Sequence, residues 1–335
     1  MNKLPEPPIK KASWPWQAHG EVLPNFMPNG SPWPKITVVT PSYNQGKYIE
    51  ETIRSVLLQG YPNLEYIIMD GGSTDQTIEV IKKYEAWIDY WVSEPDRGQT
   101  HAINKGFEKG TGDIVAWLNS DDYYLPKALE KVALCFSAHP DSLVLGDVDE
   151  FSCGNELGTR KMHHVELKSM LQPMDGSWMW HQPGTFVPAV IQQQVGTLDE
   201  SLHYAFDKDW MFHLLQIAPV HYLGSSLVRF RIHQAAKTNS DLDLTIQEIF
   251  QVNSRFLNKL NPQEAKHLRA LYHIRLAGLY LIEHREYAPY FHRWKGILEL
   301  IKGLSEKLAI IHSGSTLKLL RRAILPKFLW HSPQK

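Results

Sequence analysis

The chain has 335 residues, of which 43% are hydrophobic and 21% are charged, and its formal net charge is −1. This length predicts about two domains with a large buried core, and the balanced charge gives no global field that would attract nucleic acid. Two cysteines are too few for a disulfide framework and favour a reducing compartment.

The first 35 residues contain eight prolines with tryptophans between them, which indicates irregular chain draped over the body of the protein. The start of the chain has no apolar core of a secretory signal, and no run of about 18 apolar residues follows. We therefore expect a cytoplasmic protein without a membrane-spanning helix.

From residue 35 onward, short apolar runs alternate with segments of helical periodicity. Strands are expected at 35–42, 64–70, 87–94, 113–119 and 141–150, and helices at 47–59, 75–86, 99–109 and 125–138. This alternation predicts an α/β fold with a mostly parallel sheet and helices on both faces. We divide the chain into an extension (1–35), an α/β domain (36–240) and a helical region (241–335).

Four predicted strands end in unusual polar sequences. These are TPSYNQ (40–45), DGGSTD (70–75), EPDRGQ (94–99) and NSDD (119–122). Any one of them is explained by a turn followed by a helix cap. Four in order are not, because the carboxyl ends of parallel strands meet at one edge of the sheet, where ligands bind.

Together with the longer runs EPDRGQTHAINKG (94–106) and GDIVAWLNSDDYYLP (112–126), these sequences resemble the family 2 glycosyltransferases. The resemblance covers about residues 35–240. It implies a GT-A fold, which is Rossmann-like, here with a helical C-terminal extension. It also implies transfer of a sugar from a nucleotide diphosphate-sugar to an acceptor hydroxyl, with inversion.

The resemblance assigns the first strand ends to the nucleotide. Asp70 is expected to accept the imide N–H of the base, which favours a UDP- or dTDP-linked donor, although it could instead cap a turn. The backbone around Thr40, Pro41 and Tyr43 would complete that pocket. Asp96 would lie nearer the nucleotide or the sugar.

NSDD matches the metal-binding Asp-x-Asp sequence of the family, with Asn119 as a departure at its first position. We expect Asn119, Ser120 and Asp121 beside the donor, and Asp121 as a ligand of Mn²⁺ or Mg²⁺ that neutralises the leaving diphosphate. Asp122 would reach the donor sugar or order the loop. An exposed acidic turn is the alternative.

Relatives place a histidine or basic residue in the segment that holds RFRIHQ (229–234). His233 is therefore a candidate third metal ligand, against the alternative of a structural histidine. Arg231 or Lys237 could steady the diphosphate.

On the acceptor side, the family has a Glu-Asp pair at the start of a helix, and its second member is the general base. Here the pair reads Phe206-Asp207, so Asp207 keeps the base position. Asp209 is the rival base or an acceptor contact, and a helix cap is the alternative for Asp207. His181 would contact the acceptor or pack in the core.

Residues 285–335 carry ten Lys and Arg against three Glu. This basic stretch predicts either a peripheral contact with the inner face of the membrane or a helical surface that is solvated or forms a dimer contact. The expected partners are a nucleotide-sugar and a saccharide or lipid-linked saccharide, and the product a polysaccharide or glycoconjugate. A metal-dependent sugar nucleotidyltransferase and a non-catalytic nucleotide- or sugar-binding protein remain as alternatives.

Overall fold

The computed structural model describes residues 4–7, 13–16, 21–163, 165–171, 180–233, 237, 241–278, 280 and 291–306. The chain divides into two compact units. The first comprises residues 1–167 and 178–236, and the second 168–177 and 237–335. The segment 168–177 thus groups with the C-terminal part of the chain.

The first unit contains a nine-stranded sheet with the order β3-β2-β1-β4-β8-β6-β9-β5, in which β7 pairs with β6. Its strands are β1 (Ile36–Ser42), β2 (Leu64–Asp70), β3 (Tyr90–Ser93), β4 (Ile114–Trp117), β5 (Tyr123–Tyr124), β6 (Leu143–Ser152), β7 (Asn155–Arg160), β8 (Thr185–Pro188) and β9 (Val220–Arg231).

The sheet is mixed rather than mostly parallel. Strands β3, β2, β1 and β4 run parallel, as the βα alternation predicts. Strand β8 then pairs antiparallel with both β4 and β6, and it separates β6 from the parallel half. The difference arises because β8, which forms both of these antiparallel pairs, lies after the alternating segments 35–150 in which strands are expected.

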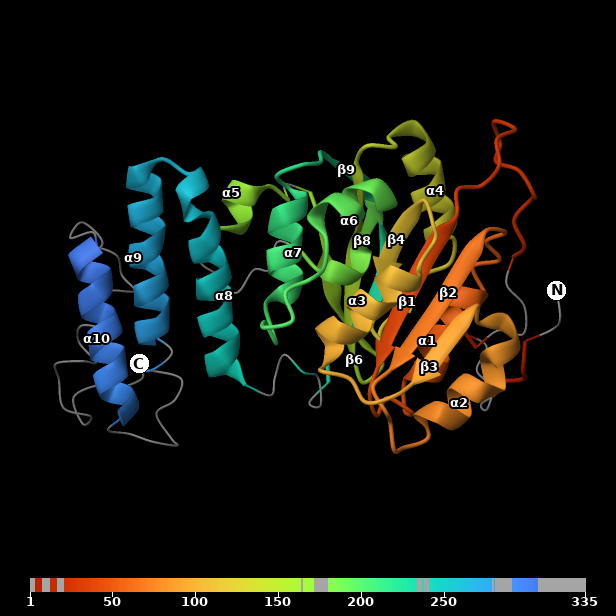
Figure 1. Cartoon of the computed structure of the whole chain (residues 1–335), viewed down its shortest axis with the longest axis horizontal. Coiled ribbons are helices and arrows are strands. Elements are labelled where there is room, and N and C mark those ends of the chain that lie inside the picture. Colours follow the sequence, from red (N-terminus) through yellow and green to blue (C-terminus); the bar gives the residue numbers. More distant parts are fainter. Residues whose placement is uncertain are drawn as a thin grey trace, which may run out of the picture. The chain divides into compact units, whose positions relative to one another are not determined.

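The described helices are α1 (Ile49–Leu57), α2 (Thr77–Tyr84), α3 (Gln99–Lys109), α4 (Ala128–Ala138), α5 (Leu167–Met170), α6 (Ala189–Val195), α7 (Phe206–Leu214), α8 (Leu242–Phe256), α9 (Pro262–Gly278) and α10 (Phe291–Glu306). Helices α1 to α4 follow strands in alternation, and Figure 1 shows α3 lying across β1. A Cβ at Gly106 would stand 2.3 Å from a methyl carbon of Val39, so only glycine allows α3 this close to β1.

The described parts of the N-terminal extension are anchored by their apolar side chains. Trp16, Leu23, Met27 and Trp33 are each at most 9% exposed. Arg54 of α1 is fully buried and donates to the carbonyl groups of Pro5 and Pro15.

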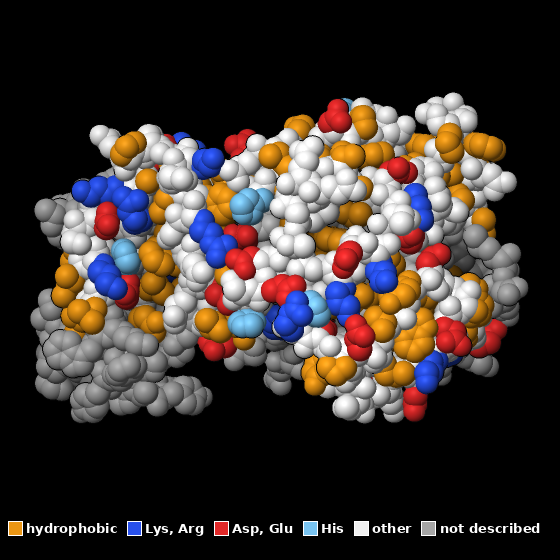
Figure 2. All heavy atoms as spheres, in the orientation of Figure 1, with side chains coloured by type: hydrophobic (Ala, Val, Ile, Leu, Met, Phe, Trp, Pro, Cys, Tyr) orange, Lys and Arg blue, Asp and Glu red, His pale blue; other side chains and the backbone are white. Residues whose placement is uncertain are grey.

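In the second unit, α9 and α10 pack together through a small core of Ala270, Ile274, Ala277 and Leu300. Leu298 and Ile301 of α10 are more than half exposed, and Figure 2 shows hydrophobic side chains among Lys and Arg on the visible face of this unit. Within the described ranges, every helix is too short or too polar to cross a membrane. Of the basic stretch 285–335, only 291–306 lies among the described residues.

Candidate active site

The polar sequences after β1, β2, β3 and β4 meet at one edge of the sheet. Ser42 is in register with Asp70, and Asp70 with Ser93, so the first three strands end at the same level. The Leu118 amide donates to the Val39 carbonyl at 2.9 Å, which carries the end of β4 to the same edge. The expected convergence of the four sequences is therefore present.

Asp70 closes the turn that follows β2. Its Oδ2 accepts from the amides of Gly72 and Ser73, at 3.1 and 2.8 Å, and from the Ser93 hydroxyl at 2.6 Å. Its Oδ1 accepts from the Ser73 hydroxyl at 2.5 Å, and the residue is 2% exposed. These bonds show that Asp70 caps the turn after β2, which is the alternative role expected for it.

Asp96, in the loop after β3, takes a position beside that turn. A Cβ at Gly71 would stand 2.7 Å from Asp96 Oδ2, so the carboxylate lies over the glycine. Its Oδ1 accepts from the Gly98 amide at 2.8 Å, and the side chain is only partly buried. Asp96 is therefore more accessible to a ligand than Asp70.

The loop after β1 is fixed to the loop after β2. The Asn44 amide donates to Ser73 Oγ at 2.7 Å, and the Thr74 amide donates back to Asn44 Oδ1 at 2.9 Å. Thr40 and Pro41 are buried, so only their backbone can line a pocket, whereas Tyr43 is 61% exposed.

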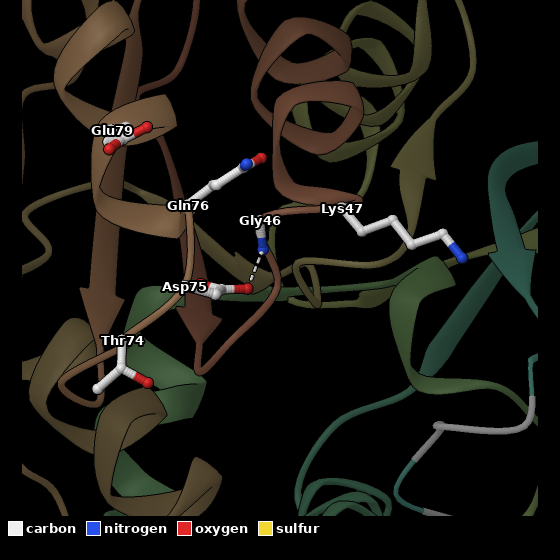
Figure 3. A pocket seen from close by; sticks show the side chains of 6 residues that line it. All are labelled: Gly46, Lys47, Thr74, Asp75, Gln76 and Glu79. Atoms are coloured by element: carbon white, nitrogen blue, oxygen red, sulfur yellow. Dashed lines mark hydrogen bonds between the residues drawn. The ribbon is translucent and has the colours of Figure 1, made fainter.

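A hollow of about 600 Å³ lies between these two loops and the start of α2. It is lined by Gly46, Lys47, Thr74, Asp75, Gln76 and Glu79. Figure 3 shows Asp75 accepting from the Gly46 amide, at 2.9 Å, while Lys47 extends away from the other lining residues. Asp75 also accepts from the Thr77 amide at 2.9 Å. Its carboxylate is thus committed to the loop.

The turn 119–122 depends on Asn119 and Asp122. Asn119 accepts from Gln99 Nε2 at 2.9 Å, and its own amide nitrogen lies 3.4 Å from Asp122 Oδ2. Asp122 is 1% exposed, and burial, followed by the charge of Asp121, raises the pKa of its carboxyl group well above the ordinary value. An amide at position 119 avoids a further negative charge here, and Asp122 orders the loop rather than reaching a sugar.

Asp121 and His233 meet at this edge. Asp121 Oδ2 lies 2.9 Å from His233 Nε2, and the two side chains are 19% and 11% exposed. The two atoms form a hydrogen bond with each other. A carboxylate oxygen and an imidazole nitrogen are also atom types that bind Mn²⁺, so this pair could contribute ligands to a divalent cation in place of that hydrogen bond. The described residues contain no group of three or more His, Cys, Asp or Glu that could hold a metal, so phosphate oxygens or water would have to complete the sphere.

Arg231 holds the turn from the end of β9. Its Nε donates to the Asp121 carbonyl and its backbone amide donates to Asp122 Oδ1, both at 2.9 Å, and its Nη2 contacts Glu51. The side chain is 14% exposed. The Arg231 guanidinium thus binds the backbone of the turn and Glu51, and Lys237 is assigned to the second unit.

Asp207 stands in the first turn of α7 and is partly buried. Burial raises the pKa of its carboxyl group to about 6, and the Lys208 amide, which donates to Oδ1 at 2.7 Å, and the charges of Lys208 and His181 oppose that rise. A carboxylate with this pKa is ionised at neutral pH and is a better proton acceptor than an ordinary one.

His181 lies close enough to Asp207 for its charge to oppose the rise of the Asp207 pKa, and it also contacts Glu150 of β6. His181 Nε2 is 3.3 Å from Glu150 Oε1, and this contact, with Arg160, lowers the pKa of Glu150 to about 2. The next residue, Gln182, donates to the Trp117 carbonyl at 2.9 Å and so fixes the loop against the end of β4.

Asp209 is 5% exposed, and its Oδ2 lies 3.7 Å from His213 Nε2, one turn further along α7. This burial favours Asp207 over Asp209 as the base. Phe206 is 6% exposed and packs beside Trp117, with ring centroids 6.4 Å apart. The family's first acidic residue is therefore replaced by a core contact.

The motif pattern misses Glu51, Glu150 and Trp16. Glu51 and Glu150 lie on α1 and β6, where nothing in the local sequence distinguishes them from other carboxylates. Trp16 belongs to the extension, whose proline and tryptophan content is a signal that this segment packs on the body.

Comparisons with known proteins match the part of the chain that carries these strand ends. A family model described as Glycosyl transferase family 2 matches residues 37–200. An uncharacterized glycosyltransferase of Rickettsia typhi is 30% identical over a 243-residue alignment, and the match covers 69% of this chain and 74% of the relative. A Bacillus subtilis protein, TuaG, whose name assigns it to teichuronic acid biosynthesis, is 43% identical over 102 residues, or 29% of this chain and 40% of TuaG.

Solved structures show the same fold. The crystal structure of S. aureus TarS 1-349 in complex with UDP-GlcNAc has a TM-score of 0.62 at 16% identity, and the match covers 86% of this chain and 87% of that one. The complex of the same protein with UDP has a TM-score of 0.59 at 16% identity. The expected GT-A fold is thereby confirmed.

Proposed function

The chain belongs to the family 2 glycosyltransferases, and from this premise we propose that it transfers a sugar from a UDP- or dTDP-linked donor to an acceptor hydroxyl with inversion. The observation that carries the proposal is the pair of Asp121 and His233, 2.9 Å apart at the carboxyl end of the parallel strands. Ligands of open α/β sheets bind at this place.

Asp96 is proposed to read the base. A carboxylate accepts a hydrogen bond from the imide N–H that uracil and thymine share, whereas cytosine offers only an acceptor at that ring nitrogen. Asp96 lies over Gly71 and is partly exposed, whereas Asp70 is consumed by its turn. The exposed ring of Tyr43 would stack on the base, and the backbone at Thr40 and Pro41 would line the pocket.

Asp121 and His233 would hold Mn²⁺ or Mg²⁺. When bound, the cation would neutralise charge on the leaving diphosphate. Asn119 and Ser120 shape the same turn, and Asp122 keeps its backbone in place through the Arg231 amide.

Asp207 is proposed as the general base. It takes the proton of the acceptor hydroxyl while that oxygen forms a bond to the anomeric carbon. The bond from the anomeric carbon to the diphosphate oxygen breaks in the same step, and its electron pair leaves with the nucleoside diphosphate. A single displacement inverts the anomeric centre and forms no covalent enzyme intermediate. The pKa of about 6 leaves Asp207 ionised at neutral pH.

The acceptor is proposed to be a saccharide or a lipid-linked saccharide, bound near His181, in polysaccharide or glycoconjugate biosynthesis. The name of TuaG, which refers to teichuronic acid biosynthesis, supports this class. We place the reaction in the cytoplasm, at the inner face of the membrane when the acceptor is lipid-linked. The departures at Phe206 and Asn119 have packing explanations, which favours catalysis over a non-catalytic binding role.

A thermal-shift panel tests the donor site. Wild type and Asp121→Ala are compared with UDP, dTDP, CDP and GDP, each with Mn²⁺, with Mg²⁺ or with EDTA. A ligand at about 100 times its dissociation constant stabilises the fold by about 2.7 kcal/mol. We expect a metal-dependent shift with UDP or dTDP that Asp121→Ala removes. Folded protein that shifts with none of the nucleotides would contradict the proposed donor site.

A further inference from the structure

A short part of the N-terminal extension reaches the turn that carries Asp121, by way of α1. The indole of Trp16 is 9% exposed, and its Nε1 donates to Glu51 Oε1 at 3.1 Å. The guanidinium of Arg54 lies 5.9 Å from the centre of the Trp16 ring. Trp16 is thus held in place against α1, with its single polar hydrogen directed at one carboxylate.

Glu51 passes this contact on to Arg231. Its second oxygen, Oε2, accepts from Arg231 Nη2, and the two side chains are 19% and 14% exposed. The Arg231 guanidinium also lies 4.8 Å from the ring of Tyr48 and 4.6 Å from that of Phe151. A charged pair enclosed in this way is screened little by solvent, and its geometry is well defined.

Arg231 then binds the turn through two hydrogen bonds. Its Nε donates to the Asp121 carbonyl, and its backbone amide donates to Asp122 Oδ1. Thr52 of α1 adds a bond from its hydroxyl to the Asp122 carbonyl at 2.7 Å. The direction of the Asp121 carboxylate toward His233 is set by this backbone, so it depends on the position of Arg231.

We propose that Trp16 is a positioning residue of the donor site, which acts through Glu51 and Arg231 to fix the backbone of Asp121 and Asp122. The effect of Trp16 on donor binding rests on the proposed function, whereas the contacts from Trp16 through Glu51 and Arg231 to the turn 119–122 do not. This role makes the extension a working part of the glycosyltransferase domain rather than a passive cover.

The test replaces one hydrogen-bond donor and keeps the aromatic packing. Trp16→Phe removes the indole N–H to Glu51. Trp33→Phe is the matched control, because Trp33 is also buried in the extension and its Nε1 donates to the Pro24 carbonyl at 2.8 Å, away from the site. Hydrogen exchange of unliganded protein is measured on peptides that span 119–124 and 229–233.

We expect exchange in these two peptides to become about three- to tenfold faster in Trp16→Phe than in wild type, because a bond to a charged group is lost. Trp33→Phe should leave them at the wild-type rate. Glu51→Gln should act like Trp16→Phe, and the double variant Trp16→Phe/Glu51→Gln should add little to either, since both act on one contact chain.

Donor binding is measured on the same proteins with UDP and Mn²⁺. The apparent dissociation constant of UDP should rise about threefold or more in Trp16→Phe, while the order of preference among the nucleotides stays the same. Equal exchange in Trp16→Phe and Trp33→Phe, or full additivity with Glu51→Gln, would overturn the positioning role. If wild type binds no nucleotide, the proposed function fails. Hydrogen exchange still decides whether Trp16 positions the backbone of Asp121 and Asp122.

Discussion

Replacing Asp207 by Asn should stabilise the fold while it removes activity. The pKa of this carboxyl group rises from the ordinary 3.8 to about 6 because the group is buried. Each pKa unit corresponds to about 1.36 kcal/mol, so at neutral pH the ionised carboxylate costs the folded state about 3 kcal/mol. The neutral amide removes that cost, and the gain is smaller than this figure because Lys208 loses its charge partner.

The pH dependence of this stabilisation follows from the sign of the shift. Between about pH 4 and 6 the folded protein binds the proton that the unfolded chain has released, so the contribution of Asp207 to stability is lost as the pH rises. The advantage of Asp207→Asn should therefore grow from pH 4 to 6 and stay constant above 6.

The assay is thermal unfolding at pH 5, 6, 7 and 8, together with donor turnover at pH 7.5. For a unit of this size, 1 kcal/mol corresponds to about 2–4 °C, so a rise of up to about 10 °C is expected above pH 6. Turnover should fall by about 10²- to 10⁴-fold. Asp141→Asn, which changes an exposed carboxylate, is the control. A variant less stable than wild type at pH 7.5, or a difference that is the same at pH 5 and 8, would refute the raised pKa.

Further predictions concern the rate, the base pocket and the core. The rate should fall about tenfold per unit below a pKa near 6 as Asp207 is protonated, and a profile that is flat from pH 5 to 8 would exclude it as the base. Asp96→Asn should raise the dissociation constant of UDP about tenfold or more and reduce the preference for UDP over CDP. Unchanged dissociation constants for both nucleotides would show that another residue recognises the base. Gly106→Ala should cost about 1–3 kcal/mol, because the new methyl group meets Val39, and an unshifted unfolding midpoint would contradict this close approach. Phe206→Glu should destabilise rather than restore a family feature, since it buries a charge beside Trp117, and a stable, faster variant would show that the position is open.

The parallel half of the fold was predictable because its signals are local. Each strand from β1 to β4 is one apolar run with its own turn and following helix, and connections of this kind force parallel neighbours. The antiparallel half was not, because β8 is short and its pairing with β4 and β6 depends on contacts distant in sequence.

The candidate site also has features that local patterns predict and features that they do not. Asp121 contacts His233 and Asp207 lies in the first turn of α7, as expected from the motifs, since strand ends and helix starts fix where these residues lie. The side-chain roles did not follow from the motif. Asp70 has the appearance of a ligand contact, yet its turn uses the carboxylate. The contact from Trp16 through Glu51 to Arg231 spans separations of 35 and 180 residues, and no local pattern announces it.

The stereochemistry of donor cleavage tests inverting transfer with Asp207 as base most directly. Wild type and Asp207→Asn are incubated with Mn²⁺ and a panel of α-linked UDP- and dTDP-hexoses, with water as the acceptor, and the first sugar released is followed by proton NMR before it mutarotates. We predict that wild type releases the β-anomer from at least one donor, at a rate that falls below pH 6, and that Asp207→Asn releases none. Release of the α-anomer, equal release by Asp207→Asn, or no cleavage of any donor by folded protein would contradict the proposed reaction.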